Sequence, residues 1–221
     1  MMTFSDRSDA GRRLAKALSK YSDRSAVILA LPRGGVPVAA EVAAALHAPL
    51  DLILVRKIGV PAQPEVAMGA VVDGTEPIIV RNEDVIEFSG TTAREFDDVC
   101  ARELAEIERR RQFYIGERAR AEIAGQVVIV IDDGIATGAT TRAALQAIRK
   151  RKPKELVLAV PVAPPDTIKE LRKEADALVC LETPEIFGAI GYFYRDFRQV
   201  SDQEVVEILK RFPVTKPASI A

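Results

Sequence analysis

The sequence predicts an α/β fold, in which a mostly parallel β-sheet is flanked by helices on both faces. Three short apolar runs indicate this fold: residues 26–31, 127–131 and 155–160. Each is rich in Val, Ile, Leu and Ala and is followed by a helical pattern, as expected for strands buried on both faces of a parallel sheet. Because ligands of such sheets bind at the carboxyl ends of the strands, the residues that follow these runs are the first candidates for a site.

The other elements follow from periodicity and from residues that start or stop helices. An amphipathic helix is expected at 6–20, and Pro164 and Ser201 are suited to the starts of two later helices. The remaining predictions are helix 36–47, strand 50–55, a hairpin of strands 70–72 and 78–80, a helical turn at 82–88, a long helix at 91–115, helix 164–174, strand 177–181 and helix 202–211.

Composition bounds the class of protein. Lys plus Arg number 31 and Asp plus Glu number 32, and the resulting net charge of −1 argues against a nucleic-acid-binding surface. No apolar run approaches the ~20 residues that cross a bilayer, and the first residues lack the apolar segment of a signal peptide. Cys100 and Cys180 stand in no metal-binding or redox pattern, so we expect reduced thiols. These observations predict a soluble, cytoplasmic enzyme with no membrane and no nucleic-acid partner.

The most informative stretch is residues 127–141, which read VVIVIDDGIATGATT. A strand ends at two adjacent carboxylates, Asp132 and Asp133, and a loop of small residues leads into a helix. Neighbouring carboxylates suit the vicinal hydroxyls of a ribose, because they accept two hydrogen bonds side by side. The loop offers hydroxyls and the free N–H groups of a helix N-terminus to a phosphate. A diol and a phosphate held this close together describe a ribose 5-phosphate.

A second anion site is predicted after the strand 26–31, where Pro32-Arg33-Gly34-Gly35 opens the next helix. The paired glycines let a ligand approach the main chain closely, and Arg33 adds a cation. Arg56 and Lys57 are expected at the carboxyl end of the strand 50–55, where two cations suit a pyrophosphate.

These motifs resemble the phosphoribosyl-diphosphate (PRPP) site of type I phosphoribosyltransferases. The resemblance implies that Asp132 and Asp133 bind the ribose hydroxyls. It assigns the 5-phosphate to Ile135, Ala136, Thr137, Gly138, Ala139, Thr140 and Thr141, and the pyrophosphate to Arg33, Gly34, Gly35, Arg56 and Lys57. Mg²⁺ is expected as the cofactor, held mainly by PRPP itself with few direct protein ligands.

The resemblance also implies an organisation for the chain. We expect one phosphoribosyltransferase domain over 1–221, with a helical insertion at 82–125 and a small hood at 182–200 that covers the acceptor. Residues 58–69, with little periodicity, resemble the family's mobile loop. The hood segment resembles that of purine enzymes, with one extra residue between Gly191 and Asp196. Acceptor binding is predicted for Phe187, Phe193, Tyr194 and Asp196.

Two departures from the family pattern leave the acceptor open. Ala136 stands where 6-oxopurine enzymes carry an Asp base, and the sequence PVAPPD at 161–166 lacks the Lys that contacts a purine O6. The predicted function is the transfer of ribose 5-phosphate from PRPP to a nitrogen nucleophile, a nucleobase-like small molecule, by a homodimer. The alternatives are a PRPP- or nucleotide-sensing regulatory protein without turnover, and a P-loop or phosphohydrolase-type domain in which the two aspartates bind Mg²⁺ directly.

Three further features are interpreted as structural. Arg7 is expected on the solvated face of the first helix, and Arg109-Arg110-Arg111 on a solvated, ion-paired face of the long helix, because Glu106 and Glu108 lie close by. His47, the only histidine, is expected to end the helix 36–47 rather than to bind a ligand.

Overall fold

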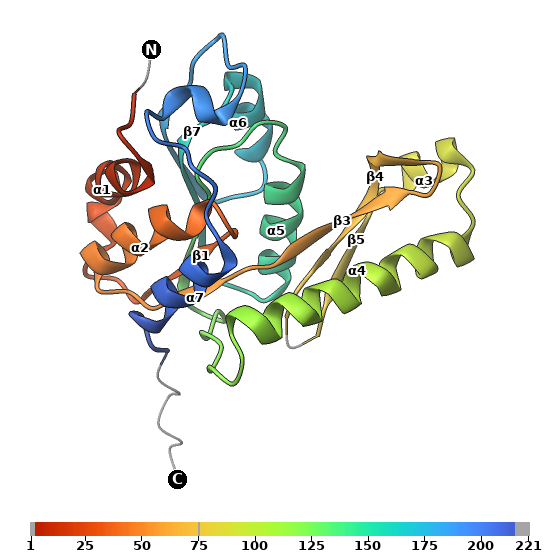
Figure 1. Cartoon of the computed structure of the whole chain (residues 1–221), viewed down its shortest axis with the longest axis horizontal. Coiled ribbons are helices and arrows are strands. Elements are labelled where there is room, and N and C mark those ends of the chain that lie inside the picture. Colours follow the sequence, from red (N-terminus) through yellow and green to blue (C-terminus); the bar gives the residue numbers. More distant parts are fainter. Residues whose placement is uncertain (1–2, 75, 215–221) are drawn as a thin grey trace.

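A five-stranded parallel sheet forms the centre of the computed structural model, which describes residues 3–74 and 76–214 (Figure 1). Its strands are β1 (Ala26–Ala30), β2 (Leu50–Leu52), β6 (Val127–Ile131), β7 (Glu155–Val162) and β8 (Ala177–Glu182), in the spatial order β2-β1-β6-β7-β8. Ala26 lies opposite Val127, which lies opposite Glu155, so β1, β6 and β7 begin level with one another. Their carboxyl ends therefore meet at one edge of the sheet.

Helices cover both faces of this sheet. On one face lie α1 (Arg7–Ala17), α2 (Gly35–Leu46) and α7 (Asp202–Lys210), and on the other α5 (Ala139–Lys150) and α6 (Pro165–Leu171) (Figure 1). Short 3₁₀ helices occupy Ser19–Tyr21 and Ile190–Phe193. Every residue of β1 and β6 is buried, which explains why these strands are continuous apolar runs rather than alternating ones.

The helix ends follow the expected capping chemistry. The side chain of Asp6 accepts the N–H of Asp9 at the start of α1, and Ser201 forms a capping box with Glu204 at the start of α7. His47 lies just past α2 in a left-handed conformation with φ of 51°, at the end of the helix as predicted.

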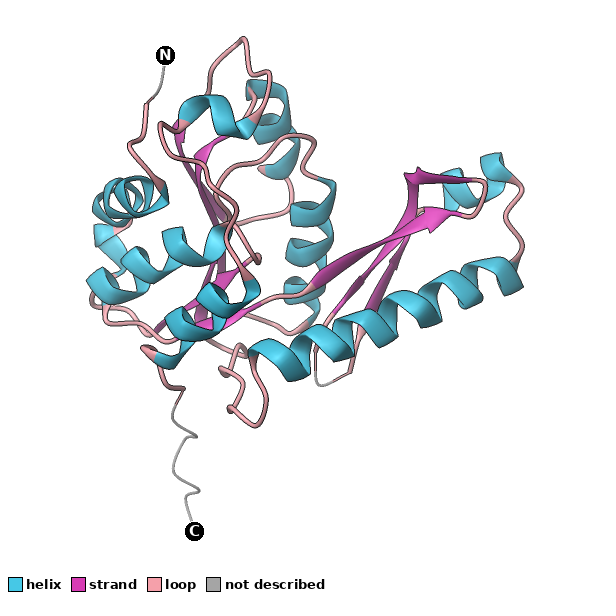
Figure 2. Cartoon of the chain, in the orientation of Figure 1, coloured by secondary structure: helices cyan, strands magenta, loops and turns pink. Residues whose placement is uncertain are grey.

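A second, three-stranded antiparallel sheet extends away from the central one (Figure 2). It contains β3 (Val55–Val60), β4 (Gln63–Val72) and β5 (Ile78–Arg81), and is followed by α3 (Glu83–Ser89) and α4 (Ala93–Tyr114). We call residues 55–114 the arm. Phe96 of α4 is buried, as are Ile58 and Met68 of the arm sheet, so the helix and the sheet share a core. The predicted long helix and the predicted hairpin at 70–80 are both present, and β4 begins earlier than expected.

One prediction about the start of the arm is wrong. The run 50–55 is not one strand: β2 ends at Leu52, and the chain leaves the central sheet before β3 begins, so Arg56 and Lys57 lie inside an antiparallel strand. Residues 58–69, which resemble the family's mobile loop, form a β-hairpin between β3 and β4. Register shifts at Ile58, Gly59 and Val60 disrupt the alternation that would have revealed these strands.

None of the helices in the described part of the chain is long and apolar enough to cross a bilayer.

Candidate functional site

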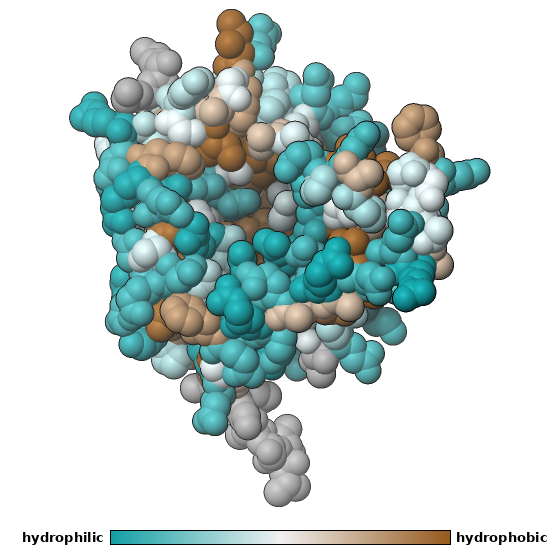
Figure 3. Space-filling model, turned by 45° about the vertical axis from the view of Figure 1, so that its right-hand side comes forward, coloured by the Kyte–Doolittle hydropathy of each residue, from teal (hydrophilic) through white to brown (hydrophobic). Residues whose placement is uncertain are grey.

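The predicted motifs meet at a small cavity at the carboxyl ends of β1 and β6. Its volume is about 120 Å³, and its walls come from the arm and from the central domain. Figure 3 shows the surface hollowed between these two parts. The cavity walls are formed by Leu31, Pro32, Leu54, Val55, Arg56, Arg110, Asp132 and Thr140. Asp132, Thr140 and Arg56 belong to the segments predicted to bind ribose, 5-phosphate and pyrophosphate, so folding brings all three predicted segments to one place.

The Pro32–Gly35 loop packs directly against the aspartates. A Cβ on Gly34 would lie 2.0 Å from Oδ2 of Asp133, and one on Gly35 would lie 2.7 Å from the carbonyl oxygen of Ile131. Only glycine fits at either position, because these distances are far below van der Waals contact. The peptide bond between Pro32 and Arg33 is cis. The glycines therefore bring the predicted pyrophosphate loop and ribose motif together.

The two carboxylates of the motif have different surroundings. Asp132 is half-buried and lines the cavity, and its Oδ1 accepts the backbone N–H of Asp133 at 2.9 Å. Loss of hydration and the neighbouring Asp133 carboxylate raise the pKa of Asp132 well above its ordinary value. Burial also raises the pKa of Asp133, although the Arg7 cation opposes the shift. A buried carboxylate of this kind is stabilised when it receives hydrogen bonds or a cation from a ligand.

Arg7 is the partner of Asp133, and the prediction that it lies on a solvated face is wrong. Its Nε donates to Oδ2 of Asp133 at 2.8 Å, and its Nη1 donates to the carbonyl oxygen of Arg198 at 2.8 Å. The guanidinium stacks 3.9 Å from the ring centre of Phe197. The C-terminal segment folds back over α1 and covers this position, a long-range contact that helical periodicity does not reveal.

Cations gather on the arm side of the cavity, and each is paired with an acid. Nε of Arg56 lies 2.7 Å from Oε2 of Glu103, and Nε of Arg110 lies 2.7 Å from Oε1 of Glu106. Lys57 bonds to Glu65 at 3.2 Å and does not line this cavity.

Arg110 was not predicted as a site residue. The ion pairing expected for the Arg109–Arg111 run is present, but Arg110 also faces the cavity. The only sequence signal is its spacing: Arg110 falls two turns after Glu103 on α4, and Glu103 pairs with Arg56.

The predicted 5-phosphate loop, residues 135–141, forms the turn between β6 and α5. Gly138 precedes the helix with φ of 77°, a left-handed conformation that favours glycine. The N–H of Ile135 bonds to Val162, and the hydroxyl of Thr167 bonds to the carbonyl oxygen of Ala136. Ile135, Gly138 and Thr141 are buried, whereas Ala136, Thr137, Ala139 and Thr140 are exposed. The first amides of α5 lack intrahelical partners and are therefore available to an anion.

The predicted acceptor residues lie in the segment that covers β6 and β7. Phe193 and Tyr194 are buried in a cluster with Phe4, and the Tyr194 hydroxyl donates to the carbonyl oxygen of Asp133 at 2.5 Å. Phe187 is half-buried against Phe193, and Asp196 is exposed. Two of the four predicted acceptor residues thus pack the hood segment against the ribose motif, which leaves Phe187 and Asp196 as the accessible ones.

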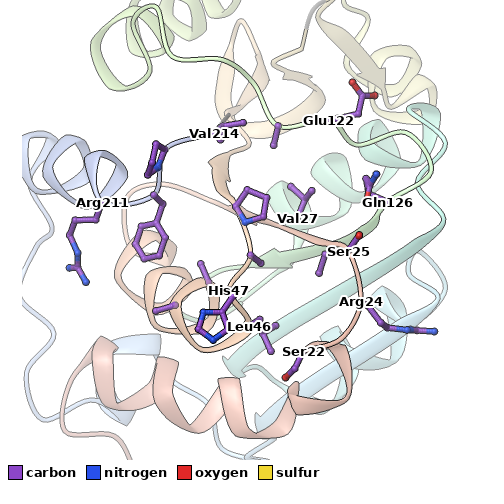
Figure 4. Close-up of a pocket in the computed structure, with 18 of the residues that line it drawn as sticks. Ser22, Arg24, Ser25, Val27, Leu46, His47, Glu122, Gln126, Arg211 and Val214 are labelled. Atoms are coloured by element: carbon purple, nitrogen blue, oxygen red, sulfur yellow. The ribbon is translucent and has the colours of Figure 1, made fainter. Parts of the chain in front are cut away.

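Larger cavities lie elsewhere. One of about 440 Å³ separates the arm from α5 and adjoins the site at Val55 and Thr140. Another, of about 1030 Å³, lies at the opposite edge of the sheet, before β1 and β6 (Figure 4). There Arg24 and Arg211 point away from one another, and Arg24 is paired with Glu155. The small cavity at the carboxyl edge is the better candidate.

Comparison with known proteins shows the family of this chain. Residues 5–198 match the family model of the phosphoribosyl transferase domain. The chain belongs to the phosphoribosyltransferase family. The five-stranded parallel sheet with helices on both faces is the type I phosphoribosyltransferase fold predicted from the sequence.

Similar proteins from other organisms support the assignment to this family. Two proteins of Mycobacterium tuberculosis, from strains CDC 1551 / Oshkosh and ATCC 25618 / H37Rv, carry the provisional name phosphoribosyl transferase; each is 47% identical over 211 residues. The match covers 96% of this chain and 47% of theirs, so the chain spans about half the length of these curated relatives. The crystal structure of the protein TT1426 from Thermus thermophilus aligns with a TM-score of 0.85 and 39% identity, over 96% of this chain and 100% of that one.

Proposed function

We propose that this phosphoribosyltransferase uses PRPP and Mg²⁺ to transfer ribose 5-phosphate to a nitrogen nucleophile, with release of pyrophosphate. The observation that carries the proposal is the cavity at the carboxyl edge of the sheet, where Asp132, Thr140 and Arg56 face one space. A carboxylate, a helix N-terminus and a guanidinium match the diol, the phosphate and the pyrophosphate of one molecule.

Each part of PRPP has a candidate partner. Asp132 accepts hydrogen bonds from the ribose hydroxyls, and Asp133 contributes Oδ1, since Arg7 occupies its Oδ2. The 5-phosphate lies on the turn 135–141 at the start of α5. The pyrophosphate lies on Arg33, Gly34 and Gly35 with Arg56. Lys57, also predicted for the pyrophosphate, pairs with Glu65 and does not line this cavity.

The site fits Mg²⁺ in the way this ion is usually bound beside phosphates. Mg²⁺ keeps several waters and takes one or two protein carboxylates, together with oxygens of the substrate. Asp132 supplies one such carboxylate at the cavity, and no group of three or more His, Cys, Asp or Glu side chains in the described residues forms a closed metal cage. When bound, Mg²⁺ would neutralise charge on the departing pyrophosphate.

In the reaction, the bond between the anomeric carbon and the pyrophosphate oxygen breaks, and a bond from that carbon to the acceptor nitrogen forms. The bond electrons leave with the pyrophosphate, and the nitrogen gives its proton to the pyrophosphate or to water. The transition state carries positive charge on the ribose ring, as in glycoside chemistry. The protein fixes the ribose through Asp132 and the 5-phosphate through the α5 turn. Its cations hold the leaving group, so catalysis rests on orientation and electrostatic stabilisation.

We propose a nucleobase-like or amine acceptor, held under the hood by Phe187 and Asp196. Asp196 is exposed, and Phe187 is half-buried, which leaves part of its ring accessible for stacking. Ala136 in the phosphate loop and the sequence 161–166 argue against the 6-oxopurines, as they did from the sequence.

The test is calorimetric titration of PRPP with Mg²⁺ into the wild type, Asp132→Asn and, as a control, Asp98→Asn, an exposed acid on α4. We expect binding to the wild type and the control, and weakened binding to Asp132→Asn. A screen of nucleobases and amines for pyrophosphate release follows. Wild-type binding without release for any acceptor would favour a PRPP-sensing protein, and no PRPP binding would refute the proposal.

A further inference from the structure

We propose that Arg110, carried by the long helix of the arm, is an additional pyrophosphate-binding residue of this site. This inference rests on the proposed function and gives the helical insertion a role in it. The cavity that holds Asp132 and Thr140 is lined by two arginines, Arg56 from β3 and Arg110 from α4. Arg110 reaches it from a segment well beyond the predicted pyrophosphate loop.

The helix is fixed in a position that keeps Arg110 at the cavity. α4 packs along β3, and Phe96 is buried between the helix and the arm sheet. At the other end of the helix, the hydroxyl of Tyr114 bonds to Asp202, which also lies 3.5 Å from Nη1 of Arg33. The helix is thus tied both to the strand that carries Arg56 and to the loop that carries Arg33.

Three arginines near the cavity each form an ion pair with an acidic side chain. Arg56 pairs with Glu103, Arg110 pairs with Glu106 and Arg33 pairs with Asp202. In the pairs of Arg56 and Arg110, the Nε atom meets the acid. A guanidinium has five N–H donors, so the terminal amino groups remain as donors for a second anion while Nε stays on the glutamate. Glu103 and Glu106 thus hold the two cations without using all of their donors.

Pyrophosphate suits this arrangement because it is compact, highly charged and rich in acceptor oxygens. Arginine binds phosphate groups through parallel N–H···O bonds that a lysine ammonium cannot reproduce. The neighbouring Arg109 offers a contrast on the same helix. It also pairs with Glu106, at 2.8 Å, but its side chain is 65% exposed and it does not line the cavity. Arg109 and Arg110 therefore differ in position and share an acidic partner.

The experiment compares Arg110→Gln with Arg109→Gln, which removes the same charge from the same helix. Each variant and the wild type is titrated with Mg²⁺-pyrophosphate, with PRPP and with ribose 5-phosphate, and its Tm is measured. We expect Arg110→Gln to bind pyrophosphate and PRPP about tenfold to a hundredfold more weakly, with ribose 5-phosphate affinity and Tm unchanged. Arg110→Lys is expected to be intermediate, and Arg109→Gln to match the wild type.

Two results would overturn the inference while leaving the proposed function intact. One is equal pyrophosphate affinity in the Arg110→Gln and Arg109→Gln proteins. The other is an equal loss of all three ligands together with a lowered Tm, which would show that Arg110 only supports the fold. Failure of the wild type to bind PRPP would instead refute the proposed function, and this inference with it.

Discussion

Nε of Arg7 lies 2.8 Å from Oδ2 of Asp133, and the side chains of both residues are about nine-tenths buried. This ion pair joins the first helix to the carboxylate motif across 126 residues of sequence. Removing one member of a buried pair leaves an uncompensated charge, which costs far more than the loss of an exposed pair.

Arg7→Met is therefore expected to lower the free energy of unfolding by about 3–5 kcal/mol, because Asp133 stays buried without its cation. Urea denaturation at neutral pH measures this change. The matched control is Arg13→Met, which removes an exposed pair with Asp9 on the same helix and should cost about 0–1 kcal/mol. Equal losses in the two variants would contradict a buried, stabilising role for Arg7.

Asp132→Asn is expected to stabilise the protein at neutral pH. The pKa of Asp132 is raised in the folded state, so the folded protein binds the proton more tightly than the unfolded chain. Its stabilising contribution is complete below the unfolded pKa of 3.8 and is lost as the pH rises through the folded pKa. The amide removes this loss, and Tm should rise by ~2–4 °C for each kcal/mol relieved.

The measurement is Tm as a function of pH, from pH 4 to pH 8, for the wild type, Asp132→Asn and Asp98→Asn. The wild type and the surface variant should lose stability across this range relative to Asp132→Asn. Parallel curves for all three proteins would contradict a raised pKa of Asp132 in the folded state.

Gly34→Ala is expected to disturb both stability and ligand binding. The added Cβ would lie 2.0 Å from Oδ2 of Asp133, so the loop must move away from the carboxylate, at a cost of about 1–3 kcal/mol. Gly90→Ala is the control, because Gly90 has φ of 66° and nothing lies within 4 Å of its added Cβ. It should cost ~1–2 kcal/mol in backbone strain and leave PRPP binding unchanged. Calorimetry with PRPP separates the two variants.

Tyr194→Phe tests the attachment of the hood segment. The variant removes the hydroxyl that bonds to the carbonyl oxygen of Asp133, and that buried carbonyl loses a donor, so we expect a loss of about 1–3 kcal/mol in unfolding free energy. Tyr192→Phe, at a side chain 71% exposed, should change stability by no more than about 0.5 kcal/mol. A Tyr194→Phe protein as stable as the wild type would mean that the hydroxyl does not hold the segment.

Local sequence patterns were sufficient to predict the structure where a single continuous segment forms the whole structural element. The stretch 127–141 contains a strand, two carboxylates, a glycine-containing turn and a helix start in unbroken order, so both its structure and its position at the sheet edge could be predicted. The parallel strands were recognisable because burial on both faces produces continuous apolar runs.

The sequence-based predictions failed where contacts between distant segments determine the structure. Ile53 and Leu54 continue the apolar run of β2, but the N–H of Leu54 bonds to Oδ1 of Asp73, and the chain departs into the arm. Arg7 and Arg110 were read as solvated helix positions. The partner of Arg7 and the cavity walls around Arg110 both come from segments far away in the sequence. Contacts between distant segments leave no periodic pattern in the sequence.

The contact of Gly34 with Asp133 has a thermodynamic consequence. No side chain on Gly34 separates the Pro32–Gly35 loop from Asp133, so neither segment can move toward the other without displacing it. Ligands that order the two segments should therefore bind cooperatively, and linkage makes the effect reciprocal. Ribose 5-phosphate should raise the affinity for pyrophosphate by the same factor by which pyrophosphate raises the affinity for ribose 5-phosphate.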